Sequence, residues 1–212
     1  MRGKGLIRDF VFGMEDGLVS NFGLVLGVYV GGGNQYAILL AGLASMFAGA
    51  FSMSAGSYLS AKSQREVYEH EIESTKEELE KNPRKCMAEM KKILRKEGID
   101  KKGIDGLFAK NGQKRHPEFV CNYVVQRKVG ITKDKFDNPL KNSTTMFFSF
   151  LFGSLFPIFP FFIEKSVNVL LVAAGLTISM LFFIGWAKSY YTKRQWFKSG
   201  LEIVIIGVAA GA

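Results

Sequence analysis

The chain has 212 residues, of which 48% are hydrophobic and 22% charged, with a formal net charge of +9 at pH 7. Residues 62–141 hold 20 of the 28 Lys and Arg and 14 of the 19 Asp and Glu, whereas the flanking segments are mostly apolar. This segregation predicts a membrane domain that is interrupted by one soluble insert. We interpret the positive charge as loops that face anionic lipid, in preference to a nucleic-acid-binding surface.

Apolar runs of membrane-spanning length occur five times. A spanning helix needs about 20 mainly apolar residues, and the runs cover about residues 8–30, 35–61, 142–163, 166–187 and 196–212. We therefore expect an all-α membrane protein with five transmembrane helices. The predicted domains are residues 1–61 with helices 1 and 2, residues 62–141 as a cytoplasmic helical domain, and residues 142–212 with helices 3 to 5.

The first predicted span carries three carboxylates, Asp9, Glu15 and Asp16. An ionised acid in hydrocarbon costs at least about 2.5 kcal/mol, so such residues normally face a water-filled path, a cation or a partner. Asp9 and Asp16 are seven residues apart, which places them on one helix face, about 10 Å apart along the axis. The pattern predicts a cation path along this face. The acids also argue against a cleaved signal peptide.

Small residues and methionines mark the first two spans. Gly23, Gly27 and Gly31 form a double GxxxG pattern, which favours close helix packing in lipid. Met46 and Met53 lie seven residues apart in the second span. Most membrane methionines fill space, but a thioether opposite an aspartate favours a borderline-soft metal such as Fe²⁺. Met53 is therefore a candidate ligand.

The insert begins with a predicted helix from Ser63 to Lys81, in which glutamates recur every three or four residues. They form an acidic stripe on one helix face: Glu66, Glu69, Glu73, Glu77 and Glu80. Like charges at this spacing destabilise a helix, so we expect positive groups nearby. A solvated helix face is the alternative interpretation of this charge run.

Two further helices are predicted in the insert. Asn82 and Pro83 predict the N-cap and first residue of one helix, which Gly98 ends. The other is predicted from Pro117 to Lys128. The two cysteines, Cys86 and Cys121, both fall in this insert, where a disulfide is not expected.

The third span ends in Pro157 and Pro160, which should break or kink its helix near the outer end. Glu202, early in the fifth span, is interpreted as an interfacial acid. Under alternating spans, the basic residues of the N-terminus, the insert and the loop Lys188–Lys198 all share one side. The positive-inside rule therefore places the N-terminus and residues 62–141 in the cytoplasm.

Five sequence boxes together resemble the vacuolar iron transporter family, including its nodulin-like relatives. They are Arg8-Asp9 followed by Gly13, Asp16 to Phe22, Ala48 to Met53, GSYLS at Gly56 to Ser60, and Phe152 to Pro160. The resemblance covers nearly the whole chain. It implies five spans with a cytoplasmic helical domain after the second, and a homodimer formed through the transmembrane helices that exchanges Fe²⁺ for protons.

The resemblance also implies roles for individual residues. Asp16 would be the central carboxylate, Met53 the thioether ligand, and Asp9 an acid near the cytoplasmic mouth. Carboxylates suit antiport, because a group that releases its proton to bind metal couples the two fluxes. The cytoplasmic acids expected to attract or bind metal are Glu78 and Glu89, which match the family pattern, and Glu66, Glu69, Glu73 and Glu77 from the stripe.

The chain departs from the family pattern at positions where metal ligands are expected. Ser45 stands in place of a glutamate, Cys86 in place of an acid, and Val124, Val125 and Lys128 in place of a Met-Met pair and a glutamate. The alternative function is therefore a family member with degraded metal capture that acts as a membrane interaction or regulatory protein.

No nucleophile–base pair or nucleotide-binding loop indicates an enzyme, and we expect no permanently bound cofactor. The expected substrates are divalent metal ions, Fe²⁺ first and Mn²⁺ next, together with protons. We expect a multi-pass protein of the cell membrane in a prokaryote, or of a vacuolar-type membrane in a eukaryote, with the lipid bilayer and a second copy as partners and no nucleic acid.

Overall fold

The computed structural model describes residues 4–102, 104, 123–125, 127, 138–163, 168–193 and 195–211. Every regular element among these residues is an α-helix, as predicted. The chain forms two compact units. The first, residues 1–61 with 137–212, is called the membrane unit below, and the second, residues 62–136, is called the insert unit.

Helix α1 runs from Lys4 to Val30 and α2 from Gln35 to Lys81. Gly32 makes the turn between them at φ 80°, a conformation that side chains other than glycine rarely adopt. Helix α2 is continuous over its 47 residues. Residues Ser63 to Lys81 are helical, as predicted, but they form the last part of α2 and not a separate short helix. No proline interrupts the segment, so the helical hydrogen bonds continue.

Four helices follow in the second half of the membrane unit: α6 at Pro139–Ile158, α7 at Pro160–Ile163, α8 at Asn168–Thr192 and α9 at Trp196–Gly211. Asn138 starts α6, because its side-chain oxygen accepts hydrogen bonds from two backbone amides of the first turn. The predicted break is confirmed: α6 ends just before Pro160, which has no amide hydrogen to continue the helix.

Three helices are long and apolar enough to cross a membrane among the described residues: Gly5–Val30, Gln35–Lys81 and Val169–Thr192. They correspond to the first, second and fourth predicted spans. Helix α6 opens with the polar run Lys141 to Thr145, and α9 has 16 residues. The third and fifth spans therefore stay predictions.

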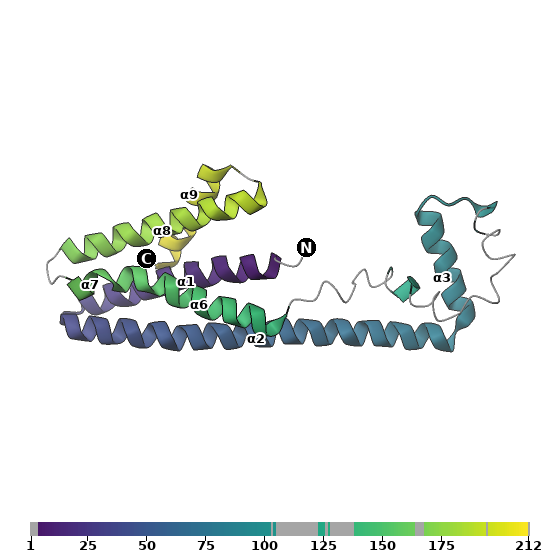
Figure 1. Ribbon diagram of the computed structural model, residues 1–212, viewed down its shortest axis with the longest axis horizontal. Helices are drawn as coiled ribbons and strands as arrows, with labels where there is room; N and C mark the ends of the chain where they lie inside the picture. The colour runs from purple at the N-terminus through teal and green to yellow at the C-terminus, as the bar shows by residue number, and fades with distance from the viewer. Residues whose placement is uncertain are drawn as a thin grey trace. The chain divides into compact units, whose positions relative to one another are not determined.

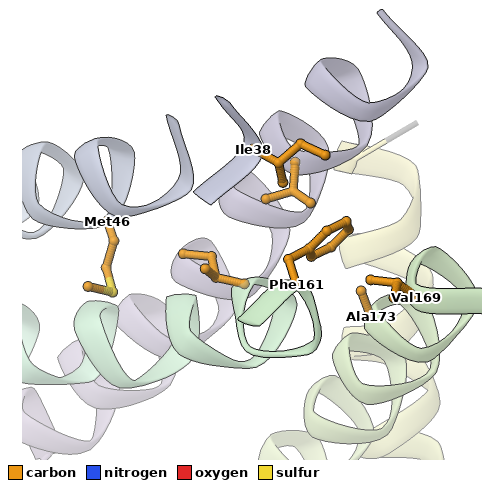
Figure 2. Close-up of a cluster of buried hydrophobic side chains, with 7 residues drawn as sticks. Ile38, Met46, Phe161, Val169 and Ala173 are labelled. Atoms are coloured by element: carbon orange, nitrogen blue, oxygen red, sulfur yellow. The ribbon is translucent and has the colours of Figure 1, made fainter. Parts of the chain in front are cut away.

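In the membrane unit, α1 packs against α6, α8 and α9 (Figure 1). Met14 and Leu18 of α1 lie in one apolar cluster with buried side chains of α8 and α9. A second cluster joins α1, α2, α6, α7 and α8, and Figure 2 shows Phe161 of α7 between Ile38 of α2 and Val169 of α8. In a bilayer such clusters stabilise the fold through close packing rather than removal from water.

Helices α1 and α6 come close at Gly13 and Gly17 of α1 and at Gly153 of α6, where a Cβ atom would lie 2.5 Å from the backbone oxygen of Met14. A Cβ atom at Gly17 would lie 2.5 Å from the backbone oxygen of Phe150, and one at Gly13 would lie 3.0 Å from α6. A Cβ at Gly23 or Gly27, in contrast, would meet no described atom within 4 Å. The predicted close packing at Gly23 and Gly27 is therefore wrong for contacts within one chain. On α1, the contact with α6 is made at Gly13 and Gly17 instead.

In the insert unit, α3 runs from Pro83 to Lys96 with Asn82 as its N-cap residue, as predicted, although the Asn82 side chain makes no capping hydrogen bond. Gly98 follows its end at φ 89°. Of the predicted third helix, residues 123–125 and 127 are helical. The remainder of residues 117–128, with Cys121 and Lys128, lies outside the described residues.

Candidate functional site

Asp9 is buried near the start of α1, with 3% of its surface exposed. Its Oδ1 lies 3.0 Å from Nε of the exposed Arg8, and its Oδ2 accepts a hydrogen bond of 3.3 Å from the hydroxyl of Ser57. These contacts offset part of the cost of burying a carboxylate. Because Ser57 belongs to α2, Asp9 also links the first two helices.

Further polar side chains from α2 and α6 accompany this contact. Ser54, one turn before Ser57, shares a hydrogen bond of 3.0 Å with Ser143. The neighbouring Asn142 is 1% exposed, and its Nδ2 has no hydrogen-bond partner among the described residues. Sequence reasoning missed this group. Only Ser57 could have been found from the sequence, since it lies in the GSYLS box. The other residues gave no indication of a site, because serine and asparagine are also ordinary helix-contact residues in membranes.

Asp16 lies two helical turns after Asp9 and is half-buried. No hydrogen bond or ion pair to its carboxylate is present in the part of the chain that the structure describes. The adjacent Glu15 lies close enough to Lys188 of α8 and Glu202 of α9 to interact with both charges. The two neighbouring acids therefore differ: Glu15 lies near other charged groups of the unit, and Asp16 is without a partner in the described structure.

The methionines of α2 also differ from each other. Met46 is 6% exposed and packs in the cluster with Val25 and Ile158, so it fills space. Met53 is half-buried, as is Ser45. Among the described residues no hydrogen bond or ion pair joins Met53 to Asp16, so their pairing as metal ligands stays a prediction.

The acidic stripe of α2 is compensated by basic residues of the same helix, as the sequence predicts. The ion pairs are Lys62–Glu66 at 3.7 Å, Arg65–Glu69 at 2.8 Å, Lys76–Glu80 at 3.8 Å and Lys81–Glu77 at 3.3 Å. Each pair joins residues one helical turn apart. Such exposed pairs stabilise a protein only slightly, but they place a cation beside four of the five stripe acids that could otherwise attract metal.

The two acids that match the family pattern lie near one cation. Lys85 of α3 donates a hydrogen bond to Glu78, and this bond and the charge of Glu78 raise the pKa of Lys85, with a smaller contribution from Glu89. Glu73 is exposed and forms no ion pair with the described residues. Glu73 is therefore the stripe acid that is left without a basic partner in the described structure.

Three of the residues that depart from the family pattern lie in the core of the insert unit. Cys86, Val124 and Val125 form a buried apolar cluster with Leu79 of α2, and Ile72, Met90 and Ile93 pack around it. Their exposed fractions are 4% or less. Among the described residues, no group of three or more His, Cys, Asp or Glu side chains is arranged to hold a metal ion.

Comparison with known proteins places the chain in a family. Residues 7–212 match the model of the VIT family. Vacuolar iron transporter 1 of Eucalyptus grandis is 30% identical over 98% of this chain and 83% of its own length, and its namesake from Oryza sativa subsp. japonica is 30% identical over 98% and 82%. Protein CCC1 of Saccharomyces cerevisiae is 28% identical over 98% and 66%. The resemblance found in the sequence boxes is thus confirmed, and the chain belongs to the VIT family.

Proposed function

We propose that this protein is a secondary transporter that moves divalent transition-metal ions out of the cytoplasm in exchange for protons. Fe²⁺ is the first substrate, supported by the names of the vacuolar iron transporter relatives, and Mn²⁺ is the next. The observation that carries the proposal is the pair of acids on α1. Asp9 is buried and held by two contacts, and Asp16 lies two turns further along the same helix without a described partner.

The two acids suit different steps of transport. A cation entering near Asp9 competes with Arg8 and Ser57 for that carboxylate. Asp16 has no such competitor in the described structure and is the stronger candidate for the central site, with Met53 of α2 supplying a thioether that favours Fe²⁺ over Mg²⁺. Because a carboxylate binds either a proton or a metal ion, the same group couples the two fluxes.

The membrane setting and assembly follow from the distribution of charge and apolar surface. The N-terminus and residues 62–141 face the cytoplasm, in a cell membrane or a vacuolar-type membrane, as the positive-inside rule indicates. The active form is a homodimer. In support, Leu40 and Phe47 are at least half exposed and lie on one face of α2, and the small-residue face at Gly23 and Gly27 is open to a second copy.

A second candidate function is that of a family member with degraded metal capture, which acts through interactions of its insert unit. The apolar cluster of Cys86, Val124 and Val125 favours it, because these residues stand where the resemblance implies metal ligands. The ion pairs along α2 favour it too, since each paired acid already has a cation beside it.

Metal-dependent proton flux in proteoliposomes separates these functions. The purified protein is tested with Fe²⁺, Mn²⁺, Co²⁺, Ni²⁺ and Zn²⁺, alongside the variants Asp16→Asn and Glu15→Gln. Each variant removes one carboxylate charge, but only Asp16 shares a helix face with Asp9. We expect flux with Fe²⁺, its loss in Asp16→Asn with unchanged folding and oligomeric state, and its retention in Glu15→Gln.

Other outcomes have distinct meanings. Wild-type flux in Asp16→Asn would remove Asp16 from the mechanism, and loss of the folded protein would assign it a structural role. No flux with any of the five metals, from protein that is folded and correctly inserted, would favour the second candidate function.

A further inference from the structure

Helix α3 has two chemically opposite faces. Cys86, Met90 and Ile93 recur at intervals of four and three residues, and all belong to the apolar cluster of the insert unit or pack against it. Ala88, Lys92 and Arg95 recur at the same intervals, two residues out of phase, which places them on the opposite side of the helix. One face of α3 is therefore fixed to the core, and the other is turned outward.

The outward face is a concentrated basic surface. Among the described residues, five line one hollow of about 550 Å³, and four of them are Lys or Arg: Ala88, Lys91, Lys92, Arg95 and Lys96. We call this set the α3 basic face. Lys92, Arg95 and Lys96 are exposed and form no ion pair with described residues, whereas Glu66, Glu69, Glu77 and Glu80 of α2 lie beside cations of their own helix. Positive charge on α3 is thus left uncompensated where the structure describes it.

We propose that the α3 basic face binds the anionic headgroups of the lipid bilayer. Long Lys and Arg side chains around a shallow hollow suit phosphate groups, which accept several hydrogen bonds and carry the complementary charge. The insert unit is joined through the continuous helix α2 to a helix of membrane-spanning character. The same chain therefore carries the α3 basic face and a segment suited to a bilayer.

This binding goes beyond transport and does not depend on the transported ion. Electrostatic attraction would hold the insert unit at the membrane surface. The affinity for anionic lipid should fall about fivefold for each basic residue removed. High salt screens the same attraction. Binding at the α3 basic face should therefore vary with the fraction of anionic lipid in the membrane, whereas metal binding at the acids of α1 need not.

Lysine reactivity in nanodiscs tests the proposal with the full chain. The protein is placed in discs of phosphatidylcholine alone or of phosphatidylcholine with phosphatidylglycerol, neither of which carries a reactive amine. Each lysine is then acylated and its modification rate measured by mass spectrometry. We expect Lys91, Lys92 and Lys96 to react several-fold more slowly in the anionic discs, and the difference to vanish at about 1 M salt, where screening leaves a range of about 3 Å. Lys76 and Lys81 on α2 should react equally in both discs.

Two charge-matched triple variants provide the control. Lys92→Gln with Arg95→Gln and Lys96→Gln should abolish the lipid-dependent protection of Lys91. The second variant, Lys62→Gln with Arg65→Gln and Lys76→Gln, removes the same charge from the paired residues of α2. It should retain the lipid-dependent protection of Lys91. Equal reactivity in both discs, or equal loss in both triple variants, would overturn the proposal. Soluble glycerophosphate is added to the neutral discs as a further arm: protection equal to that in anionic discs would assign the face to free phosphate compounds and overturn binding to the bilayer.

Discussion

Asn21 of α1 donates a hydrogen bond of 2.8 Å to the hydroxyl of Ser154 on α6, and both side chains are completely buried. Asn21 also donates to the backbone oxygen of Gly17, and Ser154 donates to that of Phe150. A Cβ atom at Gly17 would lie 2.5 Å from this Phe150 oxygen, so the hydrogen bond lies beside a close approach of α1 and α6. The hydrogen bond therefore fixes the register of the helix that carries Asp16 against α6.

We expect Asn21 and Ser154 to be energetically coupled. A double-mutant cycle with Asn21→Ala and Ser154→Ala should give a coupling free energy of about 0.6 kcal/mol, and at most about 1.7 kcal/mol, the range for hydrogen bonds between membrane helices. The measurement is the free energy of unfolding in mixed detergent micelles. Ser179→Ala is the control, because Ser179 is exposed and its hydroxyl bonds, among the described residues, only to Gly175 of its own helix. Strictly additive effects of the two substitutions would contradict the coupling.

A methyl group at Gly17 should disrupt the contact between α1 and α6. Gly17→Ala places a Cβ atom 2.5 Å from a backbone oxygen, which cannot move without shifting α6, so we expect a loss of about 1–3 kcal/mol in unfolding free energy. Gly175→Ala in α8 is the matched control, since its Cβ meets no described atom within 4 Å and alanine favours a helix by about 1 kcal/mol. Equal destabilisation of the two variants would show that the close approach is not at Gly17.

The glycines of α1 show what the sequence could and could not predict. Helix positions follow from local features, so apolar runs and Pro160 predicted α1, α8 and the break after α6. A GxxxG pattern marks a face that permits close packing, but nothing local says whether a neighbour lies there. The contact at Gly17 depends on where α6 runs, which is a property of the whole fold.

The candidate site also has features that the sequence could predict and features that it could not. The placement of Asp9 and Asp16 on one face could be predicted, because the helical period alone determines it. The contact between Asp9 and Ser57 could not, because it joins residues that are 48 positions apart in sequence. Cys86 was recognised as a departure from the family pattern, but its burial against Val124 needed the tertiary structure.

The predicted orientation can be tested by cysteine labelling, with a reporter other than Cys86. Cys86 is 2% exposed, so a membrane-impermeant maleimide would label it slowly on either side. Ser74→Cys and Tyr36→Cys introduce exposed reporters in the last part and the first turn of α2. In a Cys121→Ser background and intact cells, Tyr36→Cys should react from outside the cytoplasm and Ser74→Cys only after permeabilisation. The reverse pattern would invert the proposed topology.

The insert unit is expected to bind Fe²⁺ or Zn²⁺ weakly and with low stoichiometry. Hard divalent sites need clustered oxygen ligands, but Cys86, Val124 and Val125 fill the core instead. Four of the five stripe acids lie beside cations of α2, and Lys85 bonds to Glu78. If the acids only raise the local cation concentration, transport depends mainly on the membrane residues Asp16 and Met53.

Calorimetry on the purified full chain, compared with a variant that carries Gln at five insert acids, tests this expectation: Glu69, Glu73, Glu77, Glu78 and Glu89. We expect weak heats in the native protein that change little in the variant, because a paired acid must first lose its cation to bind metal. Asp16→Asn serves as the control for metal bound in the membrane unit. Tight binding of several ions per chain that persists in Asp16→Asn and disappears in the five-residue variant would contradict the prediction. It would mean that the ion pairs of α2 open to form a metal site, and that the apolar core of the insert unit has not replaced metal capture.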